Sequence, residues 1–257
     1  MEKTKIEWAD SSWNPISGCY NTCPYCYARG TANRFKGCDA APDGHTDQPI
    51  VVLNERMKVT SKSGGTRGAA YPYGFTPTFH KYRLKDPLTK GFGETIFVCS
   101  MADMFGDWIP DEWIVEIFEA CKAAEGHRYL FLTKNPKRYV WLHEDGLLPE
   151  LDNFWYGSTA DNPDADIFKS DYHNTFVSME PILKPFPYPD SPEALRDNWI
   201  IMGAETGSRT NRVSPERSWV EPYVEFCQKN NIPVFMKDSM KPIWGEDIIT
   251  ELPWNKK

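Results

Sequence analysis

The alternation of short apolar runs with longer amphipathic segments most constrains the fold of this chain. From residue 94 onward, apolar runs expected to form strands occupy 95–99, 128–132, 154–158, 175–179, 199–202 and 233–236. Amphipathic segments between them predict helices at 111–124, 135–143 and 215–230. Apolar strands that alternate with helices indicate a parallel sheet covered on both faces.

A further strand expected at 11–18 brings the pattern to about six to seven βα units in a single domain spanning 1–257. The predicted fold class is therefore α/β, with a parallel (β/α) barrel of the TIM type that is partial or near-complete. Residues 37–93 interrupt the pattern with a long insertion rich in Gly and Pro. A connection of this length is typical of a lid or binding loop, or it contains short elements.

Composition narrows the classes of function. With 257 residues, of which 40% are hydrophobic and 14% aromatic, the chain can bury a full core and is not expected to be disordered. A net charge of −7 argues against phosphate binding by the whole surface, although a local basic patch stays possible. The sequence has no apolar run of about 20 residues and no apolar leader segment, so we expect a cytoplasmic protein that does not span a membrane.

Three of the seven cysteines lie within eight residues, with the spacing C-x3-C-x2-C: Cys19, Cys23 and Cys26. An odd total with this clustering argues against a disulfide framework and favours a metal centre. Structural zinc needs four ligands, usually in two pairs; Cys38 is available as a fourth, but a second C-x2-C pair is missing. An iron–sulfur cubane with three cysteine ligands would leave one iron open to a small molecule.

This spacing, with the aromatic Tyr25 directly before the last cysteine, resembles the signature of the radical S-adenosylmethionine superfamily. Six further segments resemble a phage-associated branch of that superfamily whose activity is unassigned: 5–15, 77–80, 100–105, 132–134, 179–181 and 203–207. The resemblance implies a [4Fe–4S] cluster on the three cysteines, S-adenosylmethionine at the fourth iron, and an external electron donor of the flavodoxin or ferredoxin type. One electron would then cleave S-adenosylmethionine to a 5′-deoxyadenosyl radical that abstracts hydrogen from a substrate.

A polar or charged residue follows each predicted strand. The carboxyl ends of parallel barrel strands share one face, where active sites lie, although each such residue alone also fits a loop cap or a paired surface charge. By resemblance, Ser100 and Asp103 stand where many members carry Gly-Gly-Glu beside the amino group of the cofactor. The other residues expected to contact cofactor or substrate are Lys134, Thr159, Asp161, Glu180 and Glu205.

The remaining chemically reactive residues allow two interpretations each. Cys121 and Cys227 lie on apolar helix faces and are expected in the core, whereas Cys99 is either buried or a hydrogen-atom donor at the barrel mouth. Basic residues of the insertion form either a grip on a nucleic acid or nucleotide or a solvated loop: Arg56, Lys58, Lys62, Arg67, His80, Lys81, Arg83 and Lys85.

Three functions stay open at this point. The first is a radical enzyme acting on a nucleic acid, a nucleotide or a related phage-linked substrate, and the second is a radical enzyme acting on a peptide or small metabolite. The third is a zinc-stabilised binding module without chemistry. The identity of the metal separates the third from the first two, and salt-dependent binding to oligonucleotides separates the first from the second.

Overall fold

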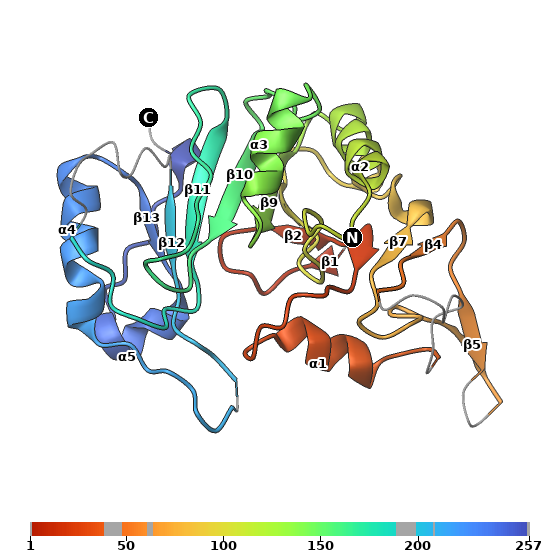
Figure 1. The fold of residues 1–257 in the computed structure, drawn as a ribbon, viewed down its shortest axis with the longest axis horizontal. Helices are drawn as coiled ribbons and strands as arrows, with labels where there is room; N and C mark the ends of the chain where they lie inside the picture. Colours follow the sequence, from red (N-terminus) through yellow and green to blue (C-terminus); the bar gives the residue numbers. More distant parts are fainter. Residues whose placement is uncertain (1, 39–47, 61–63, 189–198, 208, 256–257) are drawn as a thin grey trace. The chain divides into compact units, whose positions relative to one another are not determined.

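The computed structural model describes residues 2–38, 48–60, 64–188, 199–207 and 209–255 (Figure 1). The chain divides into two compact units, Met1–Tyr129 and Leu130–Lys257, which are described separately. The prediction that the whole chain is one barrel domain stays a prediction.

The first unit carries part of the parallel sheet. Its strands β1 (Glu2–Lys3), β2 (Ser11–Trp13) and β8 (Thr95–Val98) are neighbours in that order. β1 pairs antiparallel to β2, and β2 pairs parallel to β8. The expected strand at 11–18 is therefore shorter than predicted, because the chain leaves this sheet after Trp13.

The insertion contains short elements rather than a structureless loop. A three-stranded sheet has the order β3 (Ile16–Ser17), β7 (Thr78–His80), β4 (Val51–Leu53). The strands β5 (Lys58–Thr60) and β6 (Thr66–Gly68) form an antiparallel pair. Two 3-10 turns follow, at Lys81–Arg83 and Pro87–Thr89. Of the two expectations for residues 37–93, the described part fits short elements, and a role as a lid stays a prediction.

The second unit contains the remaining parallel strands. Strand β9 (Arg128–Thr133) begins at the end of the first unit, and the order from there is β9, β10 (Phe154–Thr159), β11 (Asn174–Met179), β12 (Ile200–Met202) and β13 (Val234–Met236). The pairs β10–β11, β11–β12 and β12–β13 are all parallel. With β2 and β8 the structure contains seven parallel strands, so the α/β class is confirmed and is consistent with a partial parallel barrel.

Three helices follow the strands where the amphipathic pattern predicts them: α2 (Asp111–Ala123), α3 (Lys137–Glu144) and α4 (Glu221–Lys229). The helices α1 (Tyr27–Arg34) and α5 (Lys241–Trp244) were not predicted, and further 3-10 turns lie at Arg217–Trp219, Asp238–Met240 and Pro253–Asn255. The predicted helix at 215–230 is wrong at its start, because a 3-10 turn precedes α4. No helix in the described ranges is long and apolar enough to cross a membrane.

Burial explains why these segments take these positions. Strands β8, β12 and β13 are buried along their whole length, as expected for parallel strands covered on both faces. Helix α2 buries Ile114, Ile117, Phe118 and Cys121 on one face. In the second unit, α4 lies beside β13 (Figure 1), and its Val224 and Cys227 pack in the core with residues of β11 to β13. The prediction that Cys121 and Cys227 are core residues is confirmed.

Candidate functional site

The cysteine motif occupies the loop between β3 and α1 in the first unit. Each of the seven cysteines is a thiol rather than half of a disulfide. Cys19 is buried, while Cys23 and Cys26 are half-buried. The Cys26 sulfur caps α1 by accepting the Arg29 backbone N–H at 3.4 Å, and the Cys19 sulfur accepts the Asn21 N–H at 3.3 Å. Backbone donors therefore orient two of the three sulfurs.

Gly18 fixes the start of this loop. Its φ is +90°, and a Cβ there would stand 2.3 Å from the Thr76 carbonyl oxygen, so only glycine fits. The Gly18 N–H donates to the Met101 carbonyl at 2.9 Å, and the Cys19 N–H donates to the Phe75 carbonyl at 3.1 Å. The motif is thus attached to the segment after β8 and to the chain before β7.

Two asparagines join the motif to the predicted residues Ser100 and Asp103. The Asn14 side-chain oxygen accepts from the Ser100 hydroxyl at 3.2 Å and from the Met101 N–H at 2.9 Å. The Asn21 side-chain N–H donates to the Asp103 carboxylate at 3.1 Å. Asp103 is buried and also accepts the Phe105 N–H at 3.1 Å. The structure therefore places Ser100 and Asp103 beside the cysteine loop, and their contact with a cofactor stays a prediction.

Aromatic and cationic groups complete the surroundings of the motif. Tyr25 lies half-buried within the loop. The hydroxyl of Tyr27 donates to the Ser100 carbonyl at 3.0 Å. The Arg29 guanidinium donates to the Asn21 carbonyl at 2.5 Å and lies 4.7 Å from the ring centre of Phe75. Sequence reasoning missed Asn14, Asn21 and Arg29, because their partners are distant in the chain or on the backbone.

The pKa values of two cysteines reflect their surroundings. Burial, and then the Asp103 carboxylate, raise the pKa of Cys19 to about 12. Burial also raises the pKa of Cys99 to about 12. Cys99 has a positive φ of 60° and is buried, so the structure agrees with its interpretation as a buried residue rather than an exposed donor.

The other predicted residues belong to the second unit, where they pair with one another or with neighbours. Lys134, after β9, lies 2.9 Å from the carboxylate of Asp161, which follows β10. Glu180, after β11, pairs with Lys237 after β13. Thr159 is the last residue of β10 and is half-buried. Lys237 directly follows the strand predicted at 233–236, and sequence reasoning did not foresee its partner.

Glu205 has the most enclosed carboxylate among these residues. Both of its oxygens accept from the Arg209 guanidinium at 2.6 Å, and one accepts the Val213 N–H at 3.1 Å. The hydrogen bond from Arg209 is the largest cause of a lowered pKa for Glu205. Lys134, Asp161, Glu180 and Glu205 are each paired within their own unit, and the contact of these residues and Thr159 with a cofactor stays a prediction.

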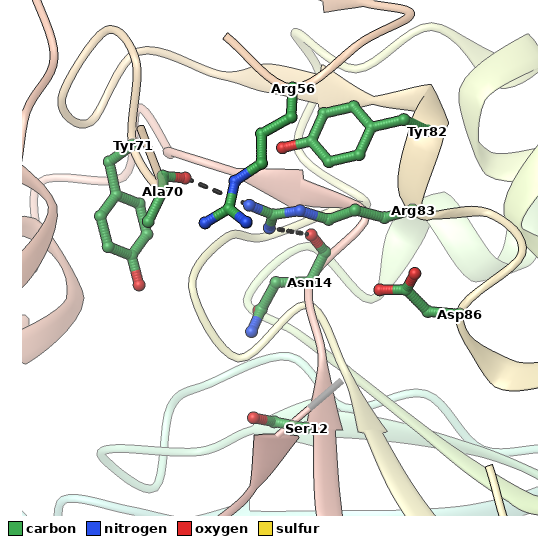
Figure 2. Close-up of a pocket in the computed structure, with 8 residues that line it drawn as sticks. All are labelled: Ser12, Asn14, Arg56, Ala70, Tyr71, Tyr82, Arg83 and Asp86. Atoms are coloured by element: carbon green, nitrogen blue, oxygen red, sulfur yellow. Dashed lines mark hydrogen bonds between the residues drawn. The ribbon is translucent and has the colours of Figure 1, made fainter. Parts of the chain in front are cut away.

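A pocket of about 390 Å³ lies in the first unit and shares Asn14 with the cysteine site (Figure 2). It is lined by Ser12, Asn14, Arg56, Ala70, Tyr71, Tyr82, Arg83 and Asp86. Arg83 donates to the carbonyls of Asn14 at 2.7 Å and Ala70 at 3.3 Å. Figure 2 shows the guanidinium groups of Arg56 and Arg83 pointing into the same space. Two cations with two tyrosines suit an anionic ligand with a planar group.

The other basic residues of the insertion differ in their surroundings, and none of those that the structure describes lines this pocket. His80 is fully buried, its Nε2 lies 2.8 Å from the Ser17 hydroxyl, and burial lowers its pKa to about 3. Its expected role in a cationic surface is therefore wrong, because the folded chain keeps it neutral. Lys81 pairs with Glu116 at 2.7 Å. Lys58, Arg67 and Lys85 line no part of this pocket, and Lys62 lies outside the described residues.

Comparison with known proteins identifies a family but no activity. No curated protein matches the chain, and no solved structure matches it. A family model described as "Protein of unknown function (DUF5131)" matches residues 3–251, which is nearly the whole sequence. The chain therefore belongs to the DUF5131 family.

Proposed function

We propose that this protein is a radical S-adenosylmethionine enzyme whose Cys19, Cys23 and Cys26 hold a [4Fe–4S] cluster. The observation that carries the proposal is the C-x3-C-x2-C loop with three thiols on one loop, anchored by Gly18 and joined to Ser100 and Asp103 through Asn14 and Asn21. When bound, such a cluster supplies the electron that splits S-adenosylmethionine into methionine and a 5′-deoxyadenosyl radical.

The number and sequence spacing of the cysteines favour a cluster over a single zinc ion. Structural zinc takes four ligands, usually from two C-x2-C pairs, and a second pair is missing from this sequence. A cubane can be held by three thiolates, each on a different iron, which leaves the fourth iron open to a small molecule.

Residues around the loop would tune and cover this centre. The N–H groups of Asn21 and Arg29 donate to motif sulfurs, and such hydrogen bonds adjust the reduction potential of iron–sulfur clusters. Asp103 and Ser100 would accept from the ammonium group of the methionine half, and Tyr25 would cover the loop. For the second unit, contact of Lys134, Thr159, Asp161, Glu180 and Glu205 with cofactor or substrate stays a prediction from the family resemblance.

The pocket lined by Arg56 and Arg83 supports a nucleotide or nucleic acid as the substrate class. Arg56 and Arg83 would neutralise a phosphate, and Tyr71 or Tyr82 would stack on a base. The net charge of −7 makes a local contact of this kind more suitable than a broad basic surface. Asn14 contacts both the pocket and the Ser100 segment, so a ligand here would lie near the residues that hold the cysteine loop.

The enzyme proposal is tested by product formation. The chain would be reconstituted anaerobically with iron and sulfide, reduced with dithionite, mixed with S-adenosylmethionine and analysed for 5′-deoxyadenosine. We expect the wild type to form it and Cys23→Ala to lose at least 100-fold of the rate, because two thiolates cannot hold the cluster in place. Cys38→Ala, a half-buried cysteine outside the motif, is the matched control and should keep the rate.

A wild type that binds one zinc and forms no 5′-deoxyadenosine would overturn this proposal and favour the binding module. Equal rates in Cys23→Ala and Cys38→Ala would also contradict it, because the motif would then be irrelevant to the reaction.

The substrate proposal is tested by the salt dependence of oligonucleotide binding. Arg56→Gln should weaken binding of a short single-stranded oligonucleotide by about ten-fold and reduce the slope of log K against log salt by roughly one. Arg56 is the better target, because Arg83 also holds the carbonyls of Asn14 and Ala70. Lys229→Gln, at the end of α4, is the control for a charge change elsewhere. If oligonucleotide binding does not depend on salt concentration, a peptide or small metabolite becomes the better candidate for the substrate.

A further inference from the structure

Two histidines and a glutamate come together in the second unit, away from every residue assigned above. His143, Glu150 and His173 each offer a ligand atom, and these atoms all lie within 4.8 Å of one another. It is the one such group of three or more His, Cys, Asp or Glu side chains among the described residues. His143 and Glu150 are 7 residues apart in the chain, and Glu150 and His173 are 23 residues apart. The three therefore do not form a short sequence motif.

The local fold holds each of the three in place. His143 is on the last turn of α3, where a tight turn follows, with the Gly146 N–H donating to the His143 carbonyl at 3.0 Å. The His143 ring stacks on Tyr172, with ring centres 5.6 Å apart, and meets the His173 ring edge-on at 5.1 Å. Glu150 lies before β10, with a carboxylate oxygen 3.9 Å from His143 Nδ1.

His173 supplies the observation that points to a ligand. It is only 6% exposed, and its Nδ1 lies 2.9 Å from the Ser170 hydroxyl. Its Nε2 is buried and makes no hydrogen bond of normal geometry among the described residues, although the Leu148 backbone also interacts with the ring. In metal-binding histidines the other ring nitrogen is held by a hydrogen bond, and the Ser170 hydroxyl can supply that bond here.

We propose that His143, Glu150 and His173 form a Zn²⁺ site, with water from the exposed side of Glu150 as the fourth ligand. Imidazole nitrogens favour zinc and similar first-row ions, whereas Mg²⁺ and Ca²⁺ prefer oxygen ligands. Zinc bonds of about 2.0–2.2 Å require ligand atoms about 3.4 Å apart. Small side-chain rotations of the exposed Glu150 and the half-buried His143 are enough to reach this spacing.

The position of the site indicates a stabilising role. His143 lies on the last turn of α3, Glu150 precedes β10, and His173 directly precedes β11, so the ligands lie at the amino ends of parallel strands. Thr159 and Glu180, which are proposed for the cofactor, lie at the carboxyl ends of the same two strands. In parallel barrels the amino-end face serves stability and the carboxyl-end face serves catalysis. Zinc would therefore tie the end of α3 to the start of β11.

The test measures zinc binding by calorimetry on the full chain, with Cys19, Cys23 and Cys26 replaced by serine so that the motif does not compete. We expect one Zn²⁺ per chain. His143→Gln and Glu150→Gln should each raise the Kd for zinc by at least ten-fold. Ser170→Ala, which removes the hydrogen bond that holds the His173 ring, should raise it by about ten-fold. Glu144→Gln, a neighbouring exposed carboxylate, is the control and should leave the Kd unchanged.

Two further readouts decide the outcome. In the parent with the three motif cysteines replaced by serine, Co²⁺ bound at this site should give visible bands without thiolate charge-transfer absorption, because no motif thiolate is left to bind it. Zinc should also raise the Tm of the parent, but not that of His143→Gln. No bound zinc, or a Kd within two-fold of the parent in both His143→Gln and Glu150→Gln, would overturn the proposal, because both changes lie on accessible side chains that a folded chain tolerates.

Discussion

The cysteine loop of the first unit and the polar strand ends of the second unit satisfy their polar groups in different ways. The loop is oriented mainly by backbone N–H groups and by neutral asparagine side chains. At the strand ends of the second unit, charges are matched by opposite charges of the same unit, as in Lys134–Asp161 and Glu205–Arg209.

This difference has a consequence for ligand binding. A thiolate ligand that accepts only weak N–H···S bonds can bind a metal without first breaking an ion pair. A carboxylate in a bidentate pair with arginine must give up strong charge-assisted hydrogen bonds before it can bind a cofactor. We therefore expect changes in the loop to abolish the metal centre and changes at the strand ends to alter affinity or stability.

The largest effect is expected from Gly18→Ala. The added Cβ meets the Thr76 carbonyl oxygen at 2.3 Å, and the φ of +90° adds strain of about 1–3 kcal/mol. The loop should shift, and iron content after reconstitution should fall at least ten-fold. Gly30→Ala is the matched control, because it lies in α1 with no atom within 4 Å of its new Cβ. That variant should keep its iron and gain up to about 1 kcal/mol in the free energy of unfolding.

Equal iron content in Gly18→Ala and Gly30→Ala would show that the loop geometry is not needed for the metal centre. The claim that the cysteine loop is oriented for metal binding would then be wrong.

A smaller effect is expected from Glu205→Gln. The neutral side chain loses its pair with Arg209, so we expect the Tm at pH 7 to fall by roughly 2–4 °C. Because the pKa of Glu205 is lowered in the folded chain, its stabilisation is present above its ordinary pKa of 4.5 and is lost as the pH falls through the folded value. Thermal unfolding followed from pH 7 to pH 3 should therefore show wild type and variant converging in acid.

Cleavage of S-adenosylmethionine by Glu205→Gln decides whether Glu205 also serves the cofactor. A KM raised several-fold supports its place in the site. Wild-type kinetics with a lowered Tm would assign Glu205 to structure alone.

Sequence periodicity predicts most of the parallel strands, because buried strands such as β8 and β13 are short apolar runs bounded by polar residues. It fails for β5 and β6, whose residues are mostly exposed and carry no apolar alternation. It also overextends the strand after residue 11, because the predicted run joins β2 to β3, which belong to different sheets and are separated by Asn14 and Pro15.

For the site, spacing alone identifies the three cysteines, and strand ends indicate Ser100 and Asp103. The role of Asn14 could not be predicted, since its partner Ser100 lies 86 residues away in the chain. His143 and His173 share that difficulty, because their approach depends on how α3 and β11 pack rather than on a local pattern.

The most direct test of the central claim is electron paramagnetic resonance of the reconstituted, dithionite-reduced chain before and after addition of S-adenosylmethionine. If Cys19, Cys23 and Cys26 hold a [4Fe–4S] cluster with one open iron, the reduced protein should give a cluster signal that changes when the cofactor binds. A cluster signal that S-adenosylmethionine leaves unchanged, or a protein that holds zinc and gives no signal, would contradict the account.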